Sequence, residues 1–324
     1  MDKSGPGPSR PKVEMTLAEF VENELPYLAD IVSFANNLPM SIYAGSTGVK
    51  SPESVYRGLL LSQNGLVAEE YLLNFKGNDA DVGIIFGTNN YSKPAVVASL
   101  ANRGQEEVED DIVALPPYRL VREPIGSVIR ARRSKREYSG KPMTMEDLST
   151  VLYYGDGVSG RLPLQNLPET ATLGRLDHIE LRTAVSGGAL YPIDLCVLAL
   201  NITGLKSGFY RYLPRYHGLK AVAQSEQGSA VSEVVQFGDI KADHANFIVA
   251  YVYRLFDNAR KYGESGLAFA LIEVGAIATN IHLTCTALGL GSCDVGSFSK
   301  RRIEKLLHLD GISQHVLHLT VVGR

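Results

Sequence analysis

Lys261 and Tyr262 stand side by side in the segment "RKYGESG", just before a long apolar run. Either side chain can carry a proton, since an amine and a phenol each bind and release one. A lysine has a reference pKa of about 10.4, so it acts as a base near neutrality only where burial or a neighbouring cation lowers that pKa. The adjacent Arg260, or desolvation against a ligand, could have this effect. The pair is an acid–base candidate if a binding site lies beside it, and an exposed loop otherwise.

The segment "RARRSKREYSG" could hold an anion, because five of the seven residues from Arg130 to Arg136 are basic. Guanidinium groups grip phosphate at two points, and the Ser134 hydroxyl and turn amides add donors. Alternation along an extended chain would place Arg132, Ser134 and Arg136 on one side. Another cation, Arg324, ends the predicted strand "TVVGR" and favours a phosphate site over the alternative, a solvated basic loop.

Two glycine-rich segments could bring backbone close to a flat ligand. The first, "SGGALYP", precedes a predicted strand and offers the Ser186 hydroxyl as a hydrogen-bond partner; the second, "GLGSCDVGSF", follows the long apolar run. Neither has the GxGxxG spacing after a strand that marks a dinucleotide-binding fold. Cys293 adjoins Asp294, whose charge would raise the pKa of the thiol, so we interpret Cys293 as a packing residue.

These segments lie among helices and strands that must position them. "KPMTMEDLSTVLYYG" predicts a helix with Thr144 as its cap and Gly155 as its stop. A second helix, of about 24 residues from Ser265 onward, is apolar on almost every face, which predicts burial. Strands are predicted at residues 194–202, 208–213, 218–223, 247–255 and 315–323. Because strict βαβ alternation is absent, the pattern favours an α+β fold with helices packed on a largely antiparallel sheet.

The chain of 324 residues changes in texture along its length. Residues 1–15 lack the apolar core of a signal peptide and are expected to form a disordered lead. Residues 16–115 are expected to form an accessory region with a helical segment "LAEFVENELPYLADIVSFANNL", a strand-like "DVGIIFGT" and an acidic linker beginning "GQEEVEDD". Residues 116–324 hold every candidate segment and are expected to form the main domain.

Composition limits the functional classes. The net charge of −3 and the lack of long basic tracts disfavour nucleic-acid binding. Three cysteines without CxxC spacing argue against zinc or a disulfide framework, so no metal is expected and a reducing cytoplasm fits. The long apolar run contains Glu273, Asn280 and His282, which disfavours a membrane span. His178, His217 and His282 lack partners at triad spacing and are interpreted as structural.

Taken in order, six segments resemble the FMN-dependent nitroreductase superfamily, and within it the SagB-type azoline dehydrogenases that mature thiazole- and oxazole-modified peptides. They are "RRSKREYSG", "SGGALYP", "YRYLPRYHGL", "KYGESG", "GLGSCDVGSF" and "VVGR", and together they cover roughly residues 122–324. The resemblance implies a nitroreductase-like fold around a long central helix, and a homodimer with FMN at the subunit interface.

The resemblance also implies roles for individual residues. For the FMN phosphate and ribityl group these are Arg132, Arg133, Ser134 and Arg136, with Arg324 at the phosphate. The stretch that covers the flavin ring, often from the second subunit, is Ser186, Gly187, Gly188 and Ala189. Backbone beside the flavin N5 comes from Val295 and Gly296, and the catalytic pair of the SagB branch is Lys261 and Tyr262. Ala189 and Tyr191 replace the Asn and Gln of the commoner nitroreductase motif, which moves the expectation away from an enzyme fed by NAD(P)H.

The chemistry expected from this resemblance is the aromatisation of an azoline ring. One ring carbon loses a proton and its neighbour loses a hydride, which the flavin can take at N5 while a base takes the proton. We expect thiazoline or oxazoline rings of a ribosomally made precursor peptide to be oxidised to thiazole or oxazole, with oxygen as the acceptor. Expected partners are that peptide, a second copy of the chain and a cyclodehydratase, and neither nucleic acid nor membrane. The alternatives are an NAD(P)H-dependent nitro- or quinone reductase and, from another class, a flavin-bound scaffold subunit of a peptide-modifying synthetase.

Overall fold

The computed structural model describes residues 71, 87, 112–163, 178–224, 234–235 and 239–324. The chain divides into two compact units, Met1–Lys76 and Gly77–Arg324, and all described residues except residue 71 belong to the second. The expected lead, the N-terminal helical segment and the run "GQEEVEDD" lie outside the described residues. Of the expected strand "DVGIIFGT" only Gly87 is described, and its backbone is helical rather than extended.

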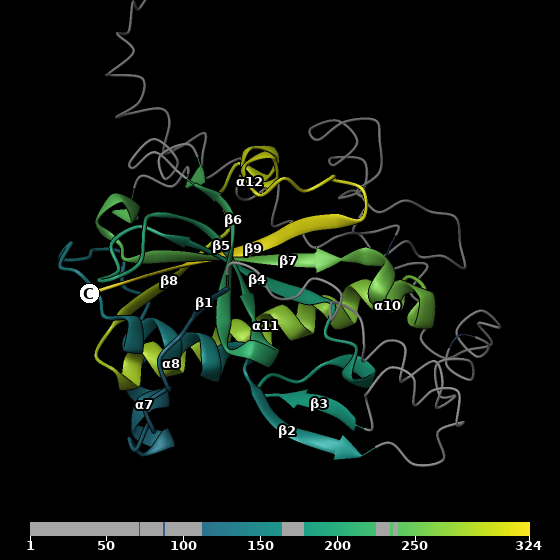
Figure 1. Ribbon diagram of the computed structural model, residues 1–324, viewed down its shortest axis with the longest axis horizontal. Coiled ribbons are helices and arrows are strands. Elements are labelled where there is room, and N and C mark those ends of the chain that lie inside the picture. The colour runs from purple at the N-terminus through teal and green to yellow at the C-terminus, as the bar shows by residue number, and fades with distance from the viewer. Residues whose placement is uncertain (1–70, 72–86, 88–111, 164–177, 225–233, 236–238) are drawn as a thin grey trace, which may run out of the picture. The chain divides into compact units, whose positions relative to one another are not determined.

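A seven-stranded sheet forms the centre of the second unit, in the order β1-β6-β5-β4-β7-β9-β8 (Figure 1). Its strands are β1 (Ile112–Ala114), β4 (Ile193–Ala199), β5 (Gly208–Leu213), β6 (Gly218–Gln224), β7 (Phe247–Arg254), β8 (Gly291–Val295) and β9 (Gln314–Gly323). Every neighbouring pair is antiparallel, which confirms the predicted α+β class. The five predicted strands correspond to β4, β5, β6, β7 and β9. The sequence did not predict the two edge strands, β8 and β1. Strand β1 lies just before residue 116, where the main domain was expected to begin.

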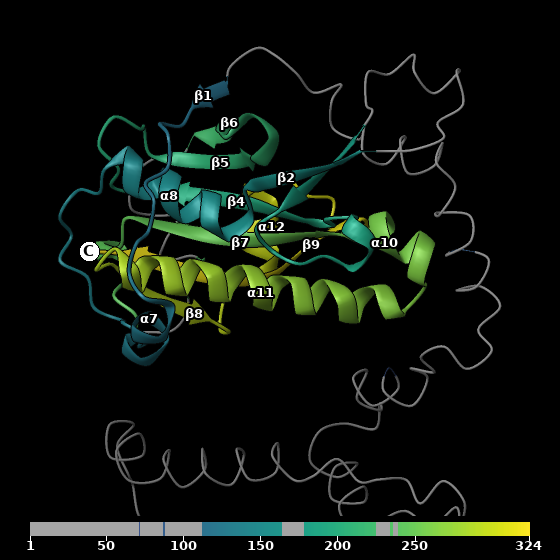
Figure 2. The same ribbon diagram turned by 90° about the horizontal axis from the view of Figure 1, so that it is seen from below.

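Alternate side chains of the sheet pack into two cores. On one face, Val249 and Tyr251 contact the core formed with α8 (Met145–Asp156) and α11 (Ser265–Ala287). On the other face, Ile248 and Val321 pack with residues of α12 (Lys300–Leu306). Figure 2 shows α11 running the length of the sheet, with α7 and the C-terminus at one end and α10 at the other.

The remaining elements are short. They are α7 (Ile125–Ala131), α10 (Leu255–Tyr262), the antiparallel pair β2 (Val158–Pro163) and β3 (His178–Arg182), and the 3-10 turns η2 (Gly187–Ala189), η3 (Pro214–Tyr216) and η4 (Ala242–His244). His217, after η3, has its Nε2 2.7 Å from Ser149 Oγ and its Nδ1 2.9 Å from Tyr212 Oη. It ties the β5–β6 turn to α8, in line with its structural interpretation.

The helix α8 begins as expected and ends later than expected. Thr144 caps it by accepting the Asp147 N–H at 3.2 Å. Gly155, the expected stop, lies inside the helix, which continues to Asp156. A β-carbon at residue 155 would stand 3.0 Å from Cγ1 of Ile281 on α11. The glycine therefore serves close packing of α8 on α11, and this contact outweighs its low helix propensity.

The expected long buried helix is α11: one of its faces is buried against the sheet, while several apolar residues on the opposite face are exposed. By length and composition alone α11 could cross a membrane. Its buried side nevertheless carries Glu273 and His282 against the sheet, as in the core helix of a folded domain. On its other side Leu271 and Ile272 are 51% and 62% exposed. These apolar side chains are therefore left largely uncovered by the described residues.

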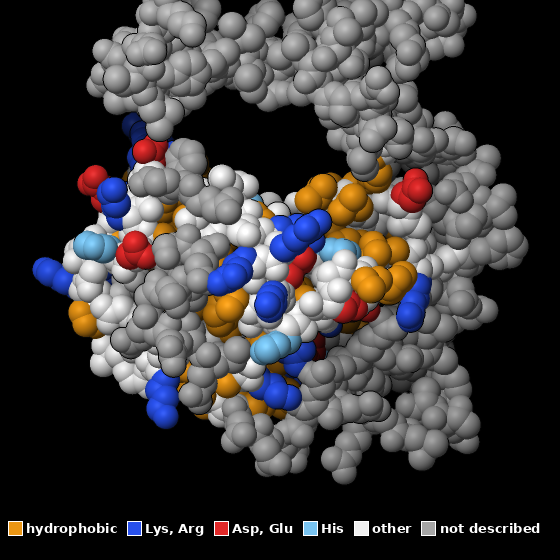
Figure 3. Space-filling view, turned by 90° about the horizontal axis from the view of Figure 1, so that it is seen from above, with side chains coloured by type: hydrophobic (Ala, Val, Ile, Leu, Met, Phe, Trp, Pro, Cys, Tyr) orange, Lys and Arg blue, Asp and Glu red, His pale blue; other side chains and the backbone are white. Residues whose placement is uncertain are grey.

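Basic side chains gather on the face seen in Figure 3, on the α12 side of the sheet. Those of α12 are all exposed: Lys300, Arg301, Arg302 and Lys305. Lys300 pairs with Glu304 of the same helix. None of the site residues expected from the sequence lies on α12 itself.

Candidate active site

Lys261 and Tyr262 meet the first glycine-rich segment in the folded chain. A β-carbon added to Gly188 would lie 2.5 Å from Lys261 Nζ and 2.5 Å from Tyr262 Oη. The amine and the hydroxyl therefore stand directly over the backbone of Gly188, where only a hydrogen fits. Two segments of separate interest in the sequence form one cluster here.

The pair lies at the end of a helix and not in an exposed loop. Lys261 and Tyr262 are the last two residues of α10, which is followed by Gly263 at φ +55°. Both side chains are partly buried. The Tyr262 ring packs edge-to-face on Phe269 of α11 at 4.9 Å between centroids, and Lys261 Nζ lies 5.0 Å from the centre of the Tyr262 ring. These contacts restrain both side chains beside Gly188.

The glycine-rich segment has a strained backbone. Gly188, Ala189 and Tyr191 have φ of +64°, +52° and +48°. For residues other than glycine this conformation costs about 1 to 3 kcal/mol and persists only where surrounding contacts enforce it. One of those contacts is local, because Ser186 Oγ accepts a hydrogen bond from the Tyr191 N–H at 2.9 Å.

Tyr191, one of the two departures from the commoner motif, anchors the segment to β3. Its buried side chain accepts the Arg182 N–H at 3.0 Å, and the Arg182 guanidinium lies 4.6 Å from the ring centre. Its carbonyl accepts a hydrogen bond from Arg254 Nη2 at 2.7 Å. Where the sequence indicated only a lost polar contact, the structure gives Tyr191 a positioning contact.

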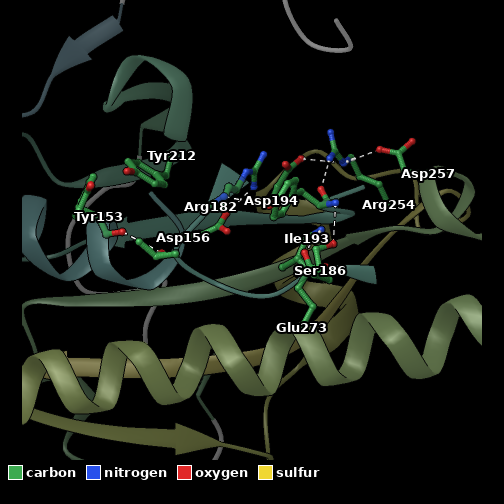
Figure 4. A network of polar contacts seen from close by, with 12 residues as sticks. Tyr153, Asp156, Arg182, Ser186, Ile193, Asp194, Tyr212, Arg254, Asp257 and Glu273 are labelled. Carbon is green, nitrogen blue, oxygen red and sulfur yellow. Dashed lines mark hydrogen bonds and ion pairs between the residues drawn. The ribbon is translucent and has the colours of Figure 1, made fainter. Parts of the chain in front are cut away.

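A network of buried charges lies beside the segment (Figure 4). Glu273 of α11 hydrogen-bonds Ser186 and accepts the Ile193 N–H at 3.4 Å. Arg182 Nη1 lies 2.6 Å from Oδ2 of Asp156 on α8. Burial raises the pKa of Glu273 to about 7, and it raises that of Asp156 to about 6 although Arg182 opposes the shift. Both carboxyl groups therefore titrate close to neutrality.

Neither Glu273 nor Arg182 is among the site residues expected from the sequence. A signal existed for Glu273, because it is the single Asp, Glu, Lys or Arg between Ser265 and Ala287. A lone charge in a buried apolar helix needs a polar partner, and such a residue is a functional-site candidate. Arg182 gives no comparable local signal.

The basic segment and the C-terminal arginine lie at the same edge of the sheet. Ser134 forms a parallel bridge with Ser292 of β8, and the Lys135 N–H donates to the Ser292 carbonyl at 3.0 Å. The Ser139 N–H donates to the carbonyl of Arg324, which follows β9, the neighbour of β8. The structure thus brings the expected phosphate residues into one region.

The cations in this region have different partners. Arg324 Nη2 lies 2.7 Å from Oδ2 of Asp147, while its side chain stays 41% exposed. Arg133 Nη1 donates to the carbonyls of Arg130 and Arg132 and so closes the end of α7. Within the described part of the chain, no carboxylate pairs with Arg132 or with Arg136. These two guanidinium groups, the Ser134 hydroxyl and the remaining donors of Arg324 suit an anion.

The end of β8 offers backbone rather than side chain to a ligand. The Val295 side chain is 1% exposed and belongs to the core on the α12 face. Asp294 accepts hydrogen bonds from His282 at 2.9 Å, His318 at 3.1 Å and Thr320 at 2.6 Å. Although burial opposes it, these bonds hold the pKa of Asp294 well below its usual range. The polar cluster keeps the strand before Gly296 in place.

The three cysteines, Cys196, Cys285 and Cys293, are free and buried. Burial raises the pKa of the Cys293 thiol; Arg136 opposes the shift and Asp294 adds to it. The interpretation of Cys293 as a packing residue is confirmed.

The expected site residues fall into groups along α11. Helix α10, whose last two residues are Lys261 and Tyr262, lies where α11 begins, and α7, which leads into the basic segment, lies at the other end of α11 (Figures 1 and 2). The glycine segment contacts α11 at Phe269 and Glu273, whereas the basic segment pairs with β8, the strand that follows the end of α11. Val295 pairs with Leu319, about midway along β9. One chain therefore presents the expected residues as two groups rather than as one cluster.

The sequence profile of the Nitroreductase family matches residues 129–324. A candidate nitroreductase of Methanocaldococcus jannaschii is 31% identical over 199 residues, covering 61% of this chain and 89% of that protein. The crystal structure of a candidate nitroreductase from Ralstonia eutropha JMP134 has a TM-score of 0.53 at 24% identity and covers 66% of this chain and 90% of that one. A chain of the Escherichia coli microcin synthetase McbBCD complex, with truncated pro-MccB17 bound, has a TM-score of 0.47 at 20% identity and covers 81% and 99%. The family match spans every site segment described above.

Proposed function

The chain belongs to the nitroreductase family, and from this premise we propose that it is an FMN-dependent dehydrogenase that oxidises thiazoline or oxazoline rings of a ribosomally made peptide to thiazole or oxazole. Membership and fold agree with the nitroreductase-like expectation from the sequence, and they imply a flavin-dependent oxidoreductase. The narrower assignment is supported by one observation. Lys261 Nζ and Tyr262 Oη meet at Gly188, within the segment expected to cover the flavin ring.

The residues present fit FMN. Arg132, Arg136 and Arg324 supply charge and paired donors for a phosphate, with the Ser134 hydroxyl beside them. The Val295–Gly296 backbone lies further along the chain from the basic segment: Gly296 is four residues after Ser292, which is about 13 Å at 3.3 Å per residue. Bound FMN supplies a hydride acceptor, which none of the protein side chains can replace.

A second copy of the chain completes the site in this proposal. The glycine segment with Lys261 and the basic segment lie at opposite ends of α11, so each flavin would take one group from each subunit. The uncovered face of α11, with Leu271 and Ile272, supports such an interface. Ile125 and Ile129 of α7, which packs against α11, are exposed as well.

Lys261 and Tyr262, which meet at Gly188, have different roles in the proposed proton transfer. Aromatisation requires a base for the proton released as the hydride leaves the neighbouring carbon. The Lys261 amine, which lies at the segment expected to cover the flavin ring, would take that proton from an azoline bound beside it. The Tyr262 hydroxyl, equally close, relays the proton or stabilises a ring nitrogen. Phe269 holds the Tyr262 ring in place and needs no part in the chemistry.

The proposal also includes the acceptor, the partners and the location. Oxygen would reoxidise the flavin and give hydrogen peroxide. A cyclodehydratase would form the azoline rings of the precursor peptide and hand them to this chain. The free cysteines suit a reducing cytoplasm.

The test compares two reactions on one preparation. The purified protein, loaded with FMN, is incubated with an azoline-containing peptide under air, and mass spectrometry follows the loss of two hydrogens per ring. The same protein is assayed with NADH or NADPH and a nitroaromatic compound or a quinone. Azole formation without a nicotinamide cofactor supports the proposal. Reduction of nitro compounds or quinones with no azole formed would instead identify the reductase.

A further inference from the structure

Glu273 is a buried carboxyl group next to the glycine segment that the proposed reaction does not use. It is 1% exposed and lies in the N-terminal half of α11, with its side chain directed to Ser186 and Ile193 (Figure 4). It accepts the Ile193 N–H at 3.4 Å and hydrogen-bonds the Ser186 side chain. The two residues that it contacts flank the strained segment, one at its start and one just after its end.

The Ser186 hydroxyl links this carboxyl group to the strained backbone. Its oxygen accepts the Tyr191 N–H at 2.9 Å. The hydroxyl can donate its own hydrogen to ionised Glu273, or accept the hydrogen of the neutral carboxyl group, so the link exists in both protonation states. Glu273 therefore holds Ser186, Ser186 holds Tyr191, and Gly188 lies between them with its left-handed backbone.

We propose that Glu273 is a positioning residue, whose buried carboxyl group holds the strained segment from Ser186 to Tyr191 so that Gly188 stays against Lys261 and Tyr262. The role of this segment in catalysis rests on the proposed function, but the way in which Glu273 holds the segment does not. Glu273 acts on Lys261 only through this chain of contacts, because its hydrogen bonds among the described residues go to Ser186 and Ile193.

Charged neighbours make the hold sensitive to pH. The groups that face Glu273 are Asp156 of α8 and Arg182 of β3, together with the Ser186 hydroxyl and the Ile193 amide. The pKa of Glu273 is raised by burial, so opening the segment to water lowers it again and is favoured once the carboxyl group ionises. The segment should be held more firmly below pH 7 than above it.

Three substitutions separate positioning from bulk packing. Glu273→Leu removes the hydrogen bonds and replaces the carboxylate side chain by an apolar one of similar size. Glu273→Gln is neutral and keeps one acceptor and a donor, so it mimics the protonated carboxyl group. Glu304→Leu is the matched control. Glu304 is also a buried carboxylate on a helix, and its Oε1 accepts the Val316 N–H at 3.0 Å, but it lies on the α12 face.

Hydrogen exchange, read by mass spectrometry on peptides covering residues 186–191, tests the proposal on the full chain without any turnover. Exchange corrected for intrinsic rates should rise from pH 5 to pH 8 in the parent. Glu273→Leu should exchange roughly tenfold faster at pH 5, while Glu273→Gln should stay close to the parent at pH 5 and lose the pH dependence due to residue 273. Glu304→Leu should leave this segment unchanged.

Equal exchange of the segment in Glu273→Leu and the parent would overturn the proposal, and so would faster exchange spread evenly over β4 and β7. If Glu273→Leu does not fold, Ser186→Ala replaces it, since it removes the linking hydroxyl and keeps Glu273. That variant must loosen the same residues for the proposal to stand. Because no azoline is involved, the result is independent of whether the proposed reaction is correct.

Discussion

Gly188 and Lys261 share one small space, because a β-carbon at residue 188 would stand 2.5 Å from Lys261 Nζ. Tyr262 Oη lies equally close to the same point. The φ of +64° at Gly188 gives a second, independent reason for glycine. The glycine segment and the lysine–tyrosine pair therefore form one surface, and a change in either should be felt by the other.

Gly188→Ala should displace the Lys261 and Tyr262 side chains and lower azoline turnover. A misplacement of catalytic groups by about 1 Å can reduce a rate on the order of 10²-fold. Gly204→Ala is the control for backbone strain, since Gly204 has φ +85° and nothing within 4 Å of an added β-carbon. Turnover is measured by peptide mass at equal bound flavin. If both variants lose the same activity, strain and not the contact with Lys261 explains the effect.

Lys261→Ala and Tyr262→Phe should keep the fold and the flavin but lose azoline oxidation. General acid–base groups commonly contribute about 10² to 10⁴-fold, and neither side chain is assigned to binding FMN. Flavin absorbance and azole formation are read on the same preparation. Parent-like turnover in both variants would mean that the pair has no part in proton transfer, and would leave the scaffold alternative as the stronger one.

The sequence predicted the elements with strong local signals. The long helix from Ser265 and the five interior strands were foreseen because apolar periodicity and caps are local properties. Gly155 shows the limit, since its role depends on Ile281, far away in the chain. Strand β8 was not predicted either, because its glycine-rich segment has a low strand propensity and the strand depends on its pairing with β9.

The candidate site was predicted as a set of motifs but not as a geometry. No spacing in the sequence shows that Lys261 reaches Gly188, or that Arg324 already pairs with Asp147. The positioning contacts of Tyr191 and Glu273 come from tertiary packing alone. The exposed side of α11 could not be foreseen either, because a helix apolar all round does not reveal which face its own chain covers.

Arg132→Ala should weaken FMN binding more than Arg133→Ala does. A charge-assisted hydrogen bond to phosphate contributes about 1.5 to 3 kcal/mol, which corresponds to a Kd raised roughly tenfold to a hundredfold. The Arg133 guanidinium is bonded to the carbonyls at the end of α7, so its loss should affect binding little. Flavin titration of the apoprotein gives both constants. A larger effect at Arg133 would contradict the assignment of the phosphate site.

Leu271→Asp should convert the proposed dimer into a monomer and release flavin. A charge on the uncovered face of α11 would be buried without a partner when two copies meet. Ile312→Asp is the control, because Ile312 is 72% exposed and lies in the loop between α12 and β9, outside α11. Light scattering should give about twice the mass of the 35.2 kDa chain for the parent and the control, and a single mass for Leu271→Asp. A parent that is monomeric with flavin bound would refute the shared site.

Glu273→Gln should make the stability of the protein less dependent on pH. Burial raises the pKa of Glu273 from 4.5 to about 7, so the folded chain binds this proton more tightly than the unfolded chain. The stability that it contributes is complete below pH 4.5 and is lost as the pH rises to 7. At 1.36 kcal/mol for each pKa unit, the ionised carboxylate costs up to about 3 kcal/mol above pH 7.

Glutamine removes this titration while keeping the shape of the side chain. Asp156, which titrates at a pKa of about 6, remains in both proteins, so the difference between them reports the ionisation of Glu273 together with its repulsion by Asp156. Denaturant unfolding at pH 5 and pH 8 gives the free energies of unfolding. The variant should gain stability relative to the parent between these two values, because only the parent carries an ionised group at residue 273 at pH 8. A difference that stays constant, or that grows in favour of the parent, would show that Glu273 is ionised throughout and that Ser186 and Arg182 compensate fully for its burial.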